Sequence, residues 1–197
     1  MKEQAIAAFR EYIKRTSFIT EEDCALFEPH LIFRKVKARE NILAEGTMCK
    51  DISFIHKGCF RTFYLLDGKE INTTFFFEHE FLAEYDSFLR NRKSRYFIQS
   101  IEDAELITIS RECLSSGYDR SKNWERFGRL MAEACYQKVT DRMESFLFMN
   151  GDQRYKQLME ADPRILKRIP LYHIASYLGL ERESLSRLRR KAALQGL

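Results

Sequence analysis

The sequence predicts an α+β protein whose strands precede a set of C-terminal helices. Three observations support this fold class. Between residues 31 and 110, short segments rich in β-branched and aromatic residues alternate with turn signals. Residues 121–149 carry apolar residues at helical spacing. Residues 171–191 contain two short helical patterns separated by a glycine, which is typical of a helix-turn-helix.

The composition is that of a globular protein. The chain has 197 residues, of which 45% are hydrophobic, with only 3 prolines and 8 glycines. No segment approaches the roughly 18 consecutive apolar residues of a membrane-spanning helix. The first 15 residues carry charges every few positions, which excludes the apolar core of a signal peptide. We therefore expect a cytoplasmic protein without a membrane partner.

Cysteine and histidine spacing gives no support for a metal site or for any cofactor. The five cysteines form no C-x-x-C pair, and the four histidines lack metal-ligand spacing. We therefore predict no disulfide framework, zinc site, iron–sulfur cluster or haem. The sequence also lacks a His-x-His pair, a G-x-S-x-G motif and a glycine-rich phosphate loop, so we do not expect an enzyme.

Two N-terminal helices and seven strands are expected before residue 111. The helices lie within residues 1–28, and the second opens at Thr20 with Asp23 in capping-box position. The predicted strands are 31–37, 41–46, 52–58, 59–66, 69–77, 95–102 and 104–110. Asp67-Gly68 predicts a two-residue hairpin turn. Evenly spaced short strands favour a sandwich or barrel, interrupted by a helical pattern over residues 80–90.

Residues 121–149 are predicted to form one long helix. Its apolar stripe begins with Trp124, Phe127, Met131 and Ala134 and continues, with a shift, through Val139, Met143, Phe146 and Phe148. Such a stripe is typical of a dimer seam, as in coiled coils. The alternative is that the whole helix packs against the strands of its own chain.

Charge is unevenly distributed along the chain. Residues 1–120 contain 18 Lys and Arg against 20 Asp and Glu, whereas residues 121–197 contain 15 against 9. A near-neutral body with a basic C-terminal end indicates a polyanionic partner. A basic helix that merely faces solvent would give the same balance.

The segment 171–191 has the apolar and turn positions of a helix-turn-helix. Ile174, Ala175 and Leu178 share one helix face, and Gly179 stands where the chain must turn tightly. Leu180, Leu185 and Leu188 are expected to point inward. Pro170 suits the start of the first helix, whereas Glu181 is a poor cap for the second.

The outward face of the second helix carries side chains that can read DNA. Glu183, Arg187 and Arg190 lie within about 60° of one another on that face. Arginine pairs with guanine O6 and N7, and glutamate accepts from cytosine N4. The neighbouring serine, arginine and lysine side chains suit phosphate groups.

A run of strands, a long helix and this motif together resemble the cyclic AMP receptor protein/FNR (CRP/FNR) family of bacterial transcription regulators. The most specific match is IASYLGLERESLSR at 174–187. The resemblance implies a cyclic-nucleotide-binding-like β-roll of jelly-roll topology at 1–120, a dimerisation helix at 121–150 and a DNA-binding domain at 151–197. It further implies that Arg182, Glu183 and Arg187 read bases and that Ser184 touches phosphate.

The wing that usually follows the recognition helix in this family is expected to be missing or vestigial. Only residues 192–197 follow Lys191. Arg189, Arg190 and Lys191 should then carry a larger share of the phosphate contacts, with Ser186 beside them.

The family's ligand segment is altered in this sequence. Phe81 to Tyr85 resembles the F-x-G-E-x pattern, with Ala83 in place of glycine and Glu84 as the ribose-binding acid. Ungapped counting places Ser94 at the phosphate-binding arginine and Arg95 one position later, on the opposite face of a strand. A one-residue gap in residues 91–93 would restore the arginine. We predict a degenerate pocket that binds no cyclic nucleotide, and the cysteine cluster of the FNR branch is absent.

These observations predict a homodimeric, sequence-specific DNA-binding transcription regulator that acts on a palindromic site. Its partners would be double-stranded DNA, a second copy bound through residues 121–150 and, for an activator, RNA polymerase. The β-roll would be either an effector sensor or a scaffold filled by residues such as Phe75, Phe76 and Phe77. The alternative is a ligand-binding β-roll whose helix-turn-helix mediates protein interaction.

Overall fold

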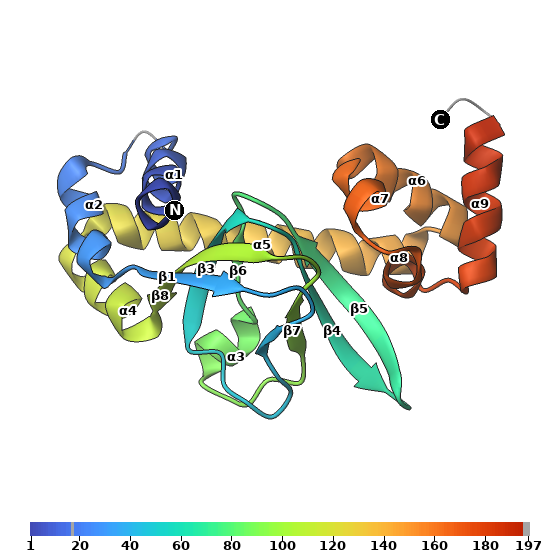
Figure 1. Ribbon diagram of the computed structural model, residues 1–197, viewed down its shortest axis with the longest axis horizontal. Helices are drawn as coiled ribbons and strands as arrows, with labels where there is room; N and C mark the ends of the chain where they lie inside the picture. Colours follow the sequence, from blue (N-terminus) through green and yellow to red (C-terminus); the bar gives the residue numbers. More distant parts are fainter. Residues whose placement is uncertain (17, 195–197) are drawn as a thin grey trace. The chain divides into compact units, whose positions relative to one another are not determined.

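The computed structural model describes residues 1–16 and 18–194, and it has the predicted α+β fold (Figure 1). The helices are α1 (Lys2–Lys14), α2 (Glu21–Phe27), the short 3-10 helix η1 (Glu28–His30), α3 (Tyr85–Arg90), α4 (Arg111–Arg120), α5 (Lys122–Phe148), α6 (Gly151–Ala161), α7 (Arg164–Arg168), α8 (Leu171–Leu178) and α9 (Arg182–Leu194). The strands are β1 (Ile32–Val36), β2 (Asn41–Leu43), β3 (Asp51–Lys57), β4 (Phe60–Leu66), β5 (Lys69–Phe76), β6 (Phe81–Leu82), β7 (Phe97–Ser100) and β8 (Ala104–Ser110).

The strands form two four-stranded sheets. Their orders are β1-β8-β3-β6 and β2-β7-β4-β5. In the first sheet β8 lies antiparallel between β1 and β3, so that Ile107 is opposite both Phe33 and Phe54. Apolar side chains from both sheets, including Phe54, Phe60 and Ile98, belong to one buried core. Each of the seven predicted strand segments contains a strand, which supports the sandwich-like interpretation.

The turn between β4 and β5 has the predicted conformation. Asp67 has φ 50° and Gly68 has φ 75°, as a two-residue hairpin of type I′ requires. Neither residue is constrained by a neighbouring element to adopt this conformation: a side chain added at Gly68 would meet no atom within 4 Å. The local Asp-Gly sequence therefore predicts this hairpin from two residues alone.

The prediction of a helix over residues 80–90 is wrong for the first half of that segment. Phe81 and Leu82 form β6, in which Leu82 lies opposite Ser53 of β3. The helix α3 begins only at Tyr85. Pairing with the buried strand β3 outweighs the local helical pattern, because tertiary context overrides weak propensity. The sequence reasoning also missed α4, although Ser110 accepts a hydrogen bond from the Cys113 N–H as its N-cap.

Helix α1 packs on the first sheet, whereas α2 packs against α4. Helix α1 buries Ala5, Phe9 and Ile13, and the rings of Phe9 and Phe54 are 5.5 Å apart. Helix α2 starts with the expected capping box, in which Thr20 and Asp23 exchange hydrogen bonds.

Helix α5 confirms the long helix but corrects the dimer seam over its first half. Trp124 and Phe127 are buried in the chain's own core, where Trp124 lies 4.0 Å from Phe27 and Phe127 lies 5.7 Å from Phe81, measured between ring centres. These two large rings fill space beside α2 and β6, so they are not available to a second chain. The second half of α5 is different, because Val139, Met143 and Phe146 are exposed.

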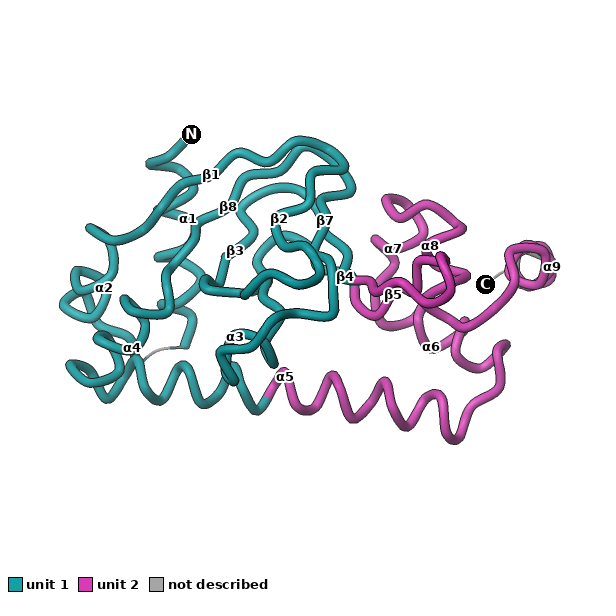
Figure 2. The backbone as a smooth tube through the Cα atoms, turned by 90° about the horizontal axis from the view of Figure 1, so that it is seen from below, with its two compact units in different colours: residues 1–62, 75–133 teal, residues 63–74, 134–197 magenta. Residues whose placement is uncertain are grey.

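The chain divides into two compact units (Figure 2). Residues 1–62 and 75–133 form the first, and residues 63–74 and 134–197 form the second. The end of the β4–β5 hairpin thus belongs with the C-terminal helices. Among the described residues, no helix combines the length and apolarity needed to cross a membrane.

Candidate functional site

Helices α8 and α9 form the predicted helix-turn-helix. Pro170 is the N-cap residue of α8, and Gly179 ends that helix in the left-handed conformation with φ 65°. The Leu180 N–H donates to the Ala175 carbonyl at 2.9 Å, which gives the six-residue closure of a Schellman motif. A side chain at Gly179 would also place its Cβ 3.0 Å from Phe146 Cε1. Glycine is therefore required at the turn for both backbone and space.

The predicted apolar positions close the motif. Ile174, Ala175, Leu178 and Leu185 are buried, whereas Leu188 is only half-buried. Leu180 faces the start of α6, because a Cβ at Gly151 would lie 2.7 Å from Leu180 Cδ2. Packing along these residues fixes α9 relative to α8.

The side chains predicted to contact DNA lie along α9, around more than one face of the helix. Most of the set is exposed, and Ser184 is half-buried; the set comprises Arg182, Glu183, Ser184, Ser186, Arg187, Arg189, Arg190 and Lys191. Arg187 donates to Ser184 Oγ at 3.1 Å, and Lys191 Nζ lies 3.8 Å from Asp152 Oδ2 of α6. The five cations and one carboxylate of this set are exposed, which suits a polyanion.

The sequence predicts that the wing after the recognition helix is missing or vestigial, and no wing strand follows α9 among the described residues. Residues 192–194 continue α9, and residues 195–197 lie outside the described residues. The basic side chains that remain near the end of α9 are therefore Arg189, Arg190 and Lys191.

Glu84 has a structural partner in place of a ligand. It is the N-cap residue of α3, where Oε1 accepts from the Asp86 N–H at 3.2 Å and Oε2 accepts from the Ser87 N–H at 2.9 Å. The side chain is buried. Both carboxylate oxygens are thus engaged by backbone amides, an arrangement that stabilises a helix start. The residue type is only a weak indication of this role, since glutamate is an uncommon cap.

The structure places the other predicted pocket residues in three different settings. Ser94 is buried, and its Oγ both donates to the Tyr96 carbonyl at 3.1 Å and accepts from the Tyr96 N–H at 2.9 Å. Arg95 is exposed in a bend before β7, so the prediction that it lies on a strand is wrong. Ala83 packs against the core.

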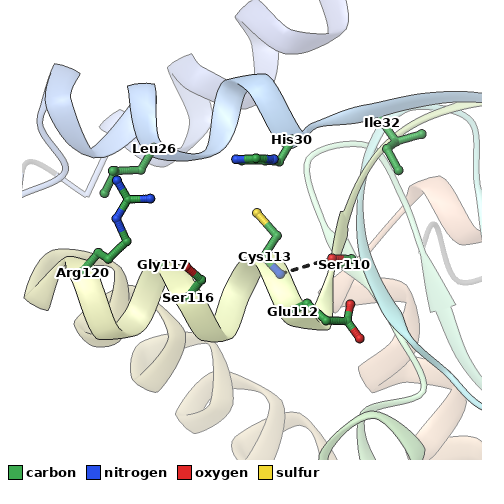
Figure 3. Close-up of a pocket in the computed structure, with 9 residues that line it drawn as sticks. All are labelled: Leu26, His30, Ile32, Ser110, Glu112, Cys113, Ser116, Gly117 and Arg120. Carbon is green, nitrogen blue, oxygen red and sulfur yellow. Dashed lines mark hydrogen bonds between the residues drawn. The ribbon is translucent and has the colours of Figure 1, made fainter.

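A cleft of about 350 Å³ lies elsewhere, between α4 and the segment from α2 to β1 (Figure 3). Figure 3 shows Cys113 directed toward His30 from the opposite wall, with Arg120 at the far end. Burial raises the pKa of the Cys113 thiol, which favours its protonated form. None of the predicted ligand residues lines this cleft, and the described residues contain no cluster of three side chains suited to a metal.

The sequence reasoning missed a polar cluster where the β4–β5 hairpin meets α8. Its members come from three separate parts of the chain, namely Glu70 and Asn72 on β5, Arg142 on α5, and His173, Ser176 and Tyr177 on α8. The Arg142 guanidinium donates to the Tyr177 carbonyl at 2.8 Å, and its central carbon lies 3.8 Å from the centre of the Tyr177 ring. Burial lowers the pKa of Arg142 from its ordinary value, although contacts with Tyr177 oppose the shift. No local pattern could reveal contacts between residues 104 positions apart.

Comparisons with known proteins agree with this geometry. Residues 33–121 match the family model of the cyclic nucleotide-binding domain. No curated protein sequence matches the chain. Among solved structures, FixK2 from Bradyrhizobium japonicum is 19% identical with a TM-score of 0.74, covering 84% of this chain and 86% of FixK2.

Two further solved structures show the same arrangement. A candidate transcriptional regulator of the CRP/FNR family from Eubacterium rectale is 21% identical with a TM-score of 0.72, covering 95% of this chain and 89% of the other. CLP from Xanthomonas campestris, described as a c-di-GMP-responsive global regulator, is 17% identical with a TM-score of 0.68, covering 90% and 94%. Residues 33–121 thus resemble a cyclic nucleotide-binding domain, the chain has the fold of CRP/FNR-type structures, and the predicted resemblance is confirmed at the level of fold.

Proposed function

We propose that this protein is a sequence-specific DNA-binding transcription regulator, with α9 as the recognition helix. The observation that carries the proposal is the exposed basic face of α9, which is held on a closed helix-turn-helix core. The CRP/FNR-type fold supports it, since the similar structures include regulators of transcription. In this proposal Arg182, Glu183 and Arg187 read bases, while Ser184, Ser186, Arg189, Arg190 and Lys191 contact phosphates.

The protein acts as a homodimer in this proposal, through the second half of α5. Tyr136, Val139, Met143 and Leu147 are 72%, 63%, 55% and 67% exposed. Their spacing places them within about 80° on one helix face. An apolar stripe of this kind leaves water when two copies pair, which lowers the free energy of the dimer. Two recognition helices would then enter successive major grooves of a palindromic site.

The domain roles in this proposal are a β-roll at 1–120, a long helix at 121–150 that pairs two copies through its second half only, and a DNA-binding domain at 151–197. The β-roll is a scaffold that needs no cyclic nucleotide, because Glu84 caps α3 and Arg95 faces solvent. Phe75 and Phe77 are buried, as a filled scaffold requires. The protein has no catalytic role in this proposal, and for an activator the further partner is RNA polymerase.

Capture of sheared genomic DNA by the purified protein, without added ligand, tests the proposal. We expect enrichment of a palindrome with half-sites about 10 base pairs apart. On that site, Arg187→Ala should weaken binding by about 1–3 kcal/mol in fluorescence anisotropy titrations. Arg15→Ala removes an exposed arginine at the C-cap of α1 and serves as the control. Equal affinities for wild type and Arg187→Ala would show that α9 does not read DNA and would favour a protein-interaction role.

The dimer has its own test by analytical ultracentrifugation. Met143→Glu introduces a charge into the exposed stripe and should shift the protein toward monomer. Gln137→Glu adds the same charge on α5 about 100° from Tyr136 and should leave the dimer intact. A monomeric wild type would overturn this part of the proposal.

A further inference from the structure

The polar cluster between β5 and α8 provides hydrogen-bond partners for backbone groups at the edge of a sheet. Strand β5 is the outermost strand of its sheet, so its outward N–H and C=O groups need partners beyond the ladder. The Asn72 N–H donates to Ser176 Oγ at 3.0 Å, and the same hydroxyl donates to the Glu70 carbonyl at 2.7 Å. One serine of α8 therefore bridges two successive outward groups of the edge strand.

Asn72 anchors the remaining contacts. It is 1% exposed, and its side-chain nitrogen Nδ2 lies 3.3 Å from His173 Nδ1. Its carbonyl accepts from Arg142 at 3.3 Å, and Arg142 also holds the Tyr177 carbonyl near the end of α8. The hairpin therefore contacts α8 at His173 and Ser176, and Arg142 of α5 adds a contact at Tyr177.

These contacts leave the recognition face uncovered. The hairpin engages His173 and Ser176 of α8, and Arg142 of α5 engages Tyr177. Glu183, Arg187 and Arg190 of α9 are exposed. Helix α9 is fixed to α8 by the buried Leu178 and Leu185 and by the tight turn at Gly179. Contacts that hold α8 in place therefore also hold α9 in place, and they leave the exposed side chains of α9 accessible.

We propose that Ser176 and Asn72 are positioning residues for DNA binding, which hold the recognition helix through α8 and the β4–β5 hairpin. The inference rests on the proposed function. A recognition helix that is already held in place loses less conformational freedom when it binds, so the contact raises affinity without touching DNA.

The test compares Ser176→Ala, which removes the hydroxyl with no added bulk, with Ser176→Thr, which keeps it. In the full chain, hydrogen exchange at the Asn72 amide should be at least about tenfold faster in Ser176→Ala and near wild type in Ser176→Thr, since a lost hydrogen bond exposes this amide. Affinity for the captured palindrome should fall about two- to tenfold in Ser176→Ala and recover in Ser176→Thr. Ser115→Ala, an exposed serine of α4, is the matched control and should change neither quantity.

The outcomes separate this inference from the function on which it rests. Unchanged exchange in Ser176→Ala, or faster exchange with unchanged DNA affinity while Arg187→Ala still weakens binding, would overturn the inference alone. Tighter binding by Ser176→Ala would also overturn it, because the contact would then hold an unproductive arrangement. If wild type and Arg187→Ala bind all DNA equally, the proposed function fails and the positioning role falls with it.

Discussion

Replacing Asp23 by asparagine should destabilise the protein more than any other conservative change in its first helices. The carboxylate is 7% exposed and accepts from Ser121 Oγ at 2.5 Å, Asn123 Nδ2 at 2.7 Å and the Thr20 N–H at 2.9 Å. It also accepts from Thr20 Oγ1 at 3.0 Å. These bonds join the capping box of α2 to the start of α5.

The expected loss of unfolding free energy follows from the hydrogen-bond donors that an asparagine side chain cannot accept from. Its amide keeps one acceptor oxygen and presents an NH₂ group to donors that formerly met the second carboxylate oxygen. Two to three charge-assisted hydrogen bonds are lost or weakened, which costs about 2–3 kcal/mol of unfolding free energy after exchange with water is counted. Urea unfolding at pH 7 should show this loss for Asp23→Asn. Glu22→Gln changes an exposed carboxylate on the same helix and should cost under about 0.5 kcal/mol.

The difference between wild type and Asp23→Asn should depend on pH. Burial opposes ionisation of Asp23, but the hydrogen bonds from Ser121, Thr20 and Asn123 outweigh it and hold the pKa of the carboxyl below its ordinary value. A lowered folded-state pKa stabilises the protein above the unfolded pKa of about 3.9, and this contribution is lost as the pH falls through the folded value. Equal unfolding free energies for Asp23→Asn and Glu22→Gln at pH 7, or a difference that grows on acidification, would refute the reasoning.

Two further substitutions test the helix-turn-helix and the altered ligand segment. Gly179→Ala should cost about 1–2 kcal/mol of unfolding free energy in thermal unfolding, because alanine disfavours φ 65° and its Cβ would press on Phe146. Gly179→Asn should cost less, because asparagine tolerates this conformation. Equal losses for the two variants would argue against backbone strain at this position. Glu84→Gln should cost about 1 kcal/mol of unfolding free energy, because it weakens the cap of α3. Added cyclic AMP should leave the melting temperatures of wild type and Glu84→Gln unchanged. Stabilisation of the wild type by cyclic AMP, lost in Glu84→Gln, would restore the ribose-binding role.

Features set by short stretches of chain were predictable. The Asp67-Gly68 turn, the capping box of Thr20 and Asp23, and the glycine at the end of α8 all have the expected geometry. Each depends on the conformational preference of one or two residues and on partners within four positions, so sequence alone carries the information. The apolar spacing of α8 and α9 belongs with them, because helical periodicity identifies the inward face without knowledge of what packs there.

Features that depend on distant partners were not predictable. The apolar stripe of α5 is uniform in sequence, yet Trp124 is buried in the core while Met143 is exposed. Which half of the stripe meets its own chain depends on where α2 and β6 end, not on the stripe itself. Glu84 likewise has the residue type of a ribose ligand, and only the start of α3 shows that backbone amides occupy both of its oxygens.

The sequence by itself determined the order of parts in this protein, namely the run of strands, the long helix and the basic helix-turn-helix, because each is encoded by local propensity, periodicity and charge. Only the tertiary structure decided which polar groups are engaged and which faces remain open. Ser176 meets Asn72 across 104 residues of sequence, and that contact exists because β5 is an edge strand whose backbone needs partners. Hydrogen bonds of this kind follow from the closure of the chain on itself, which no window of sequence contains.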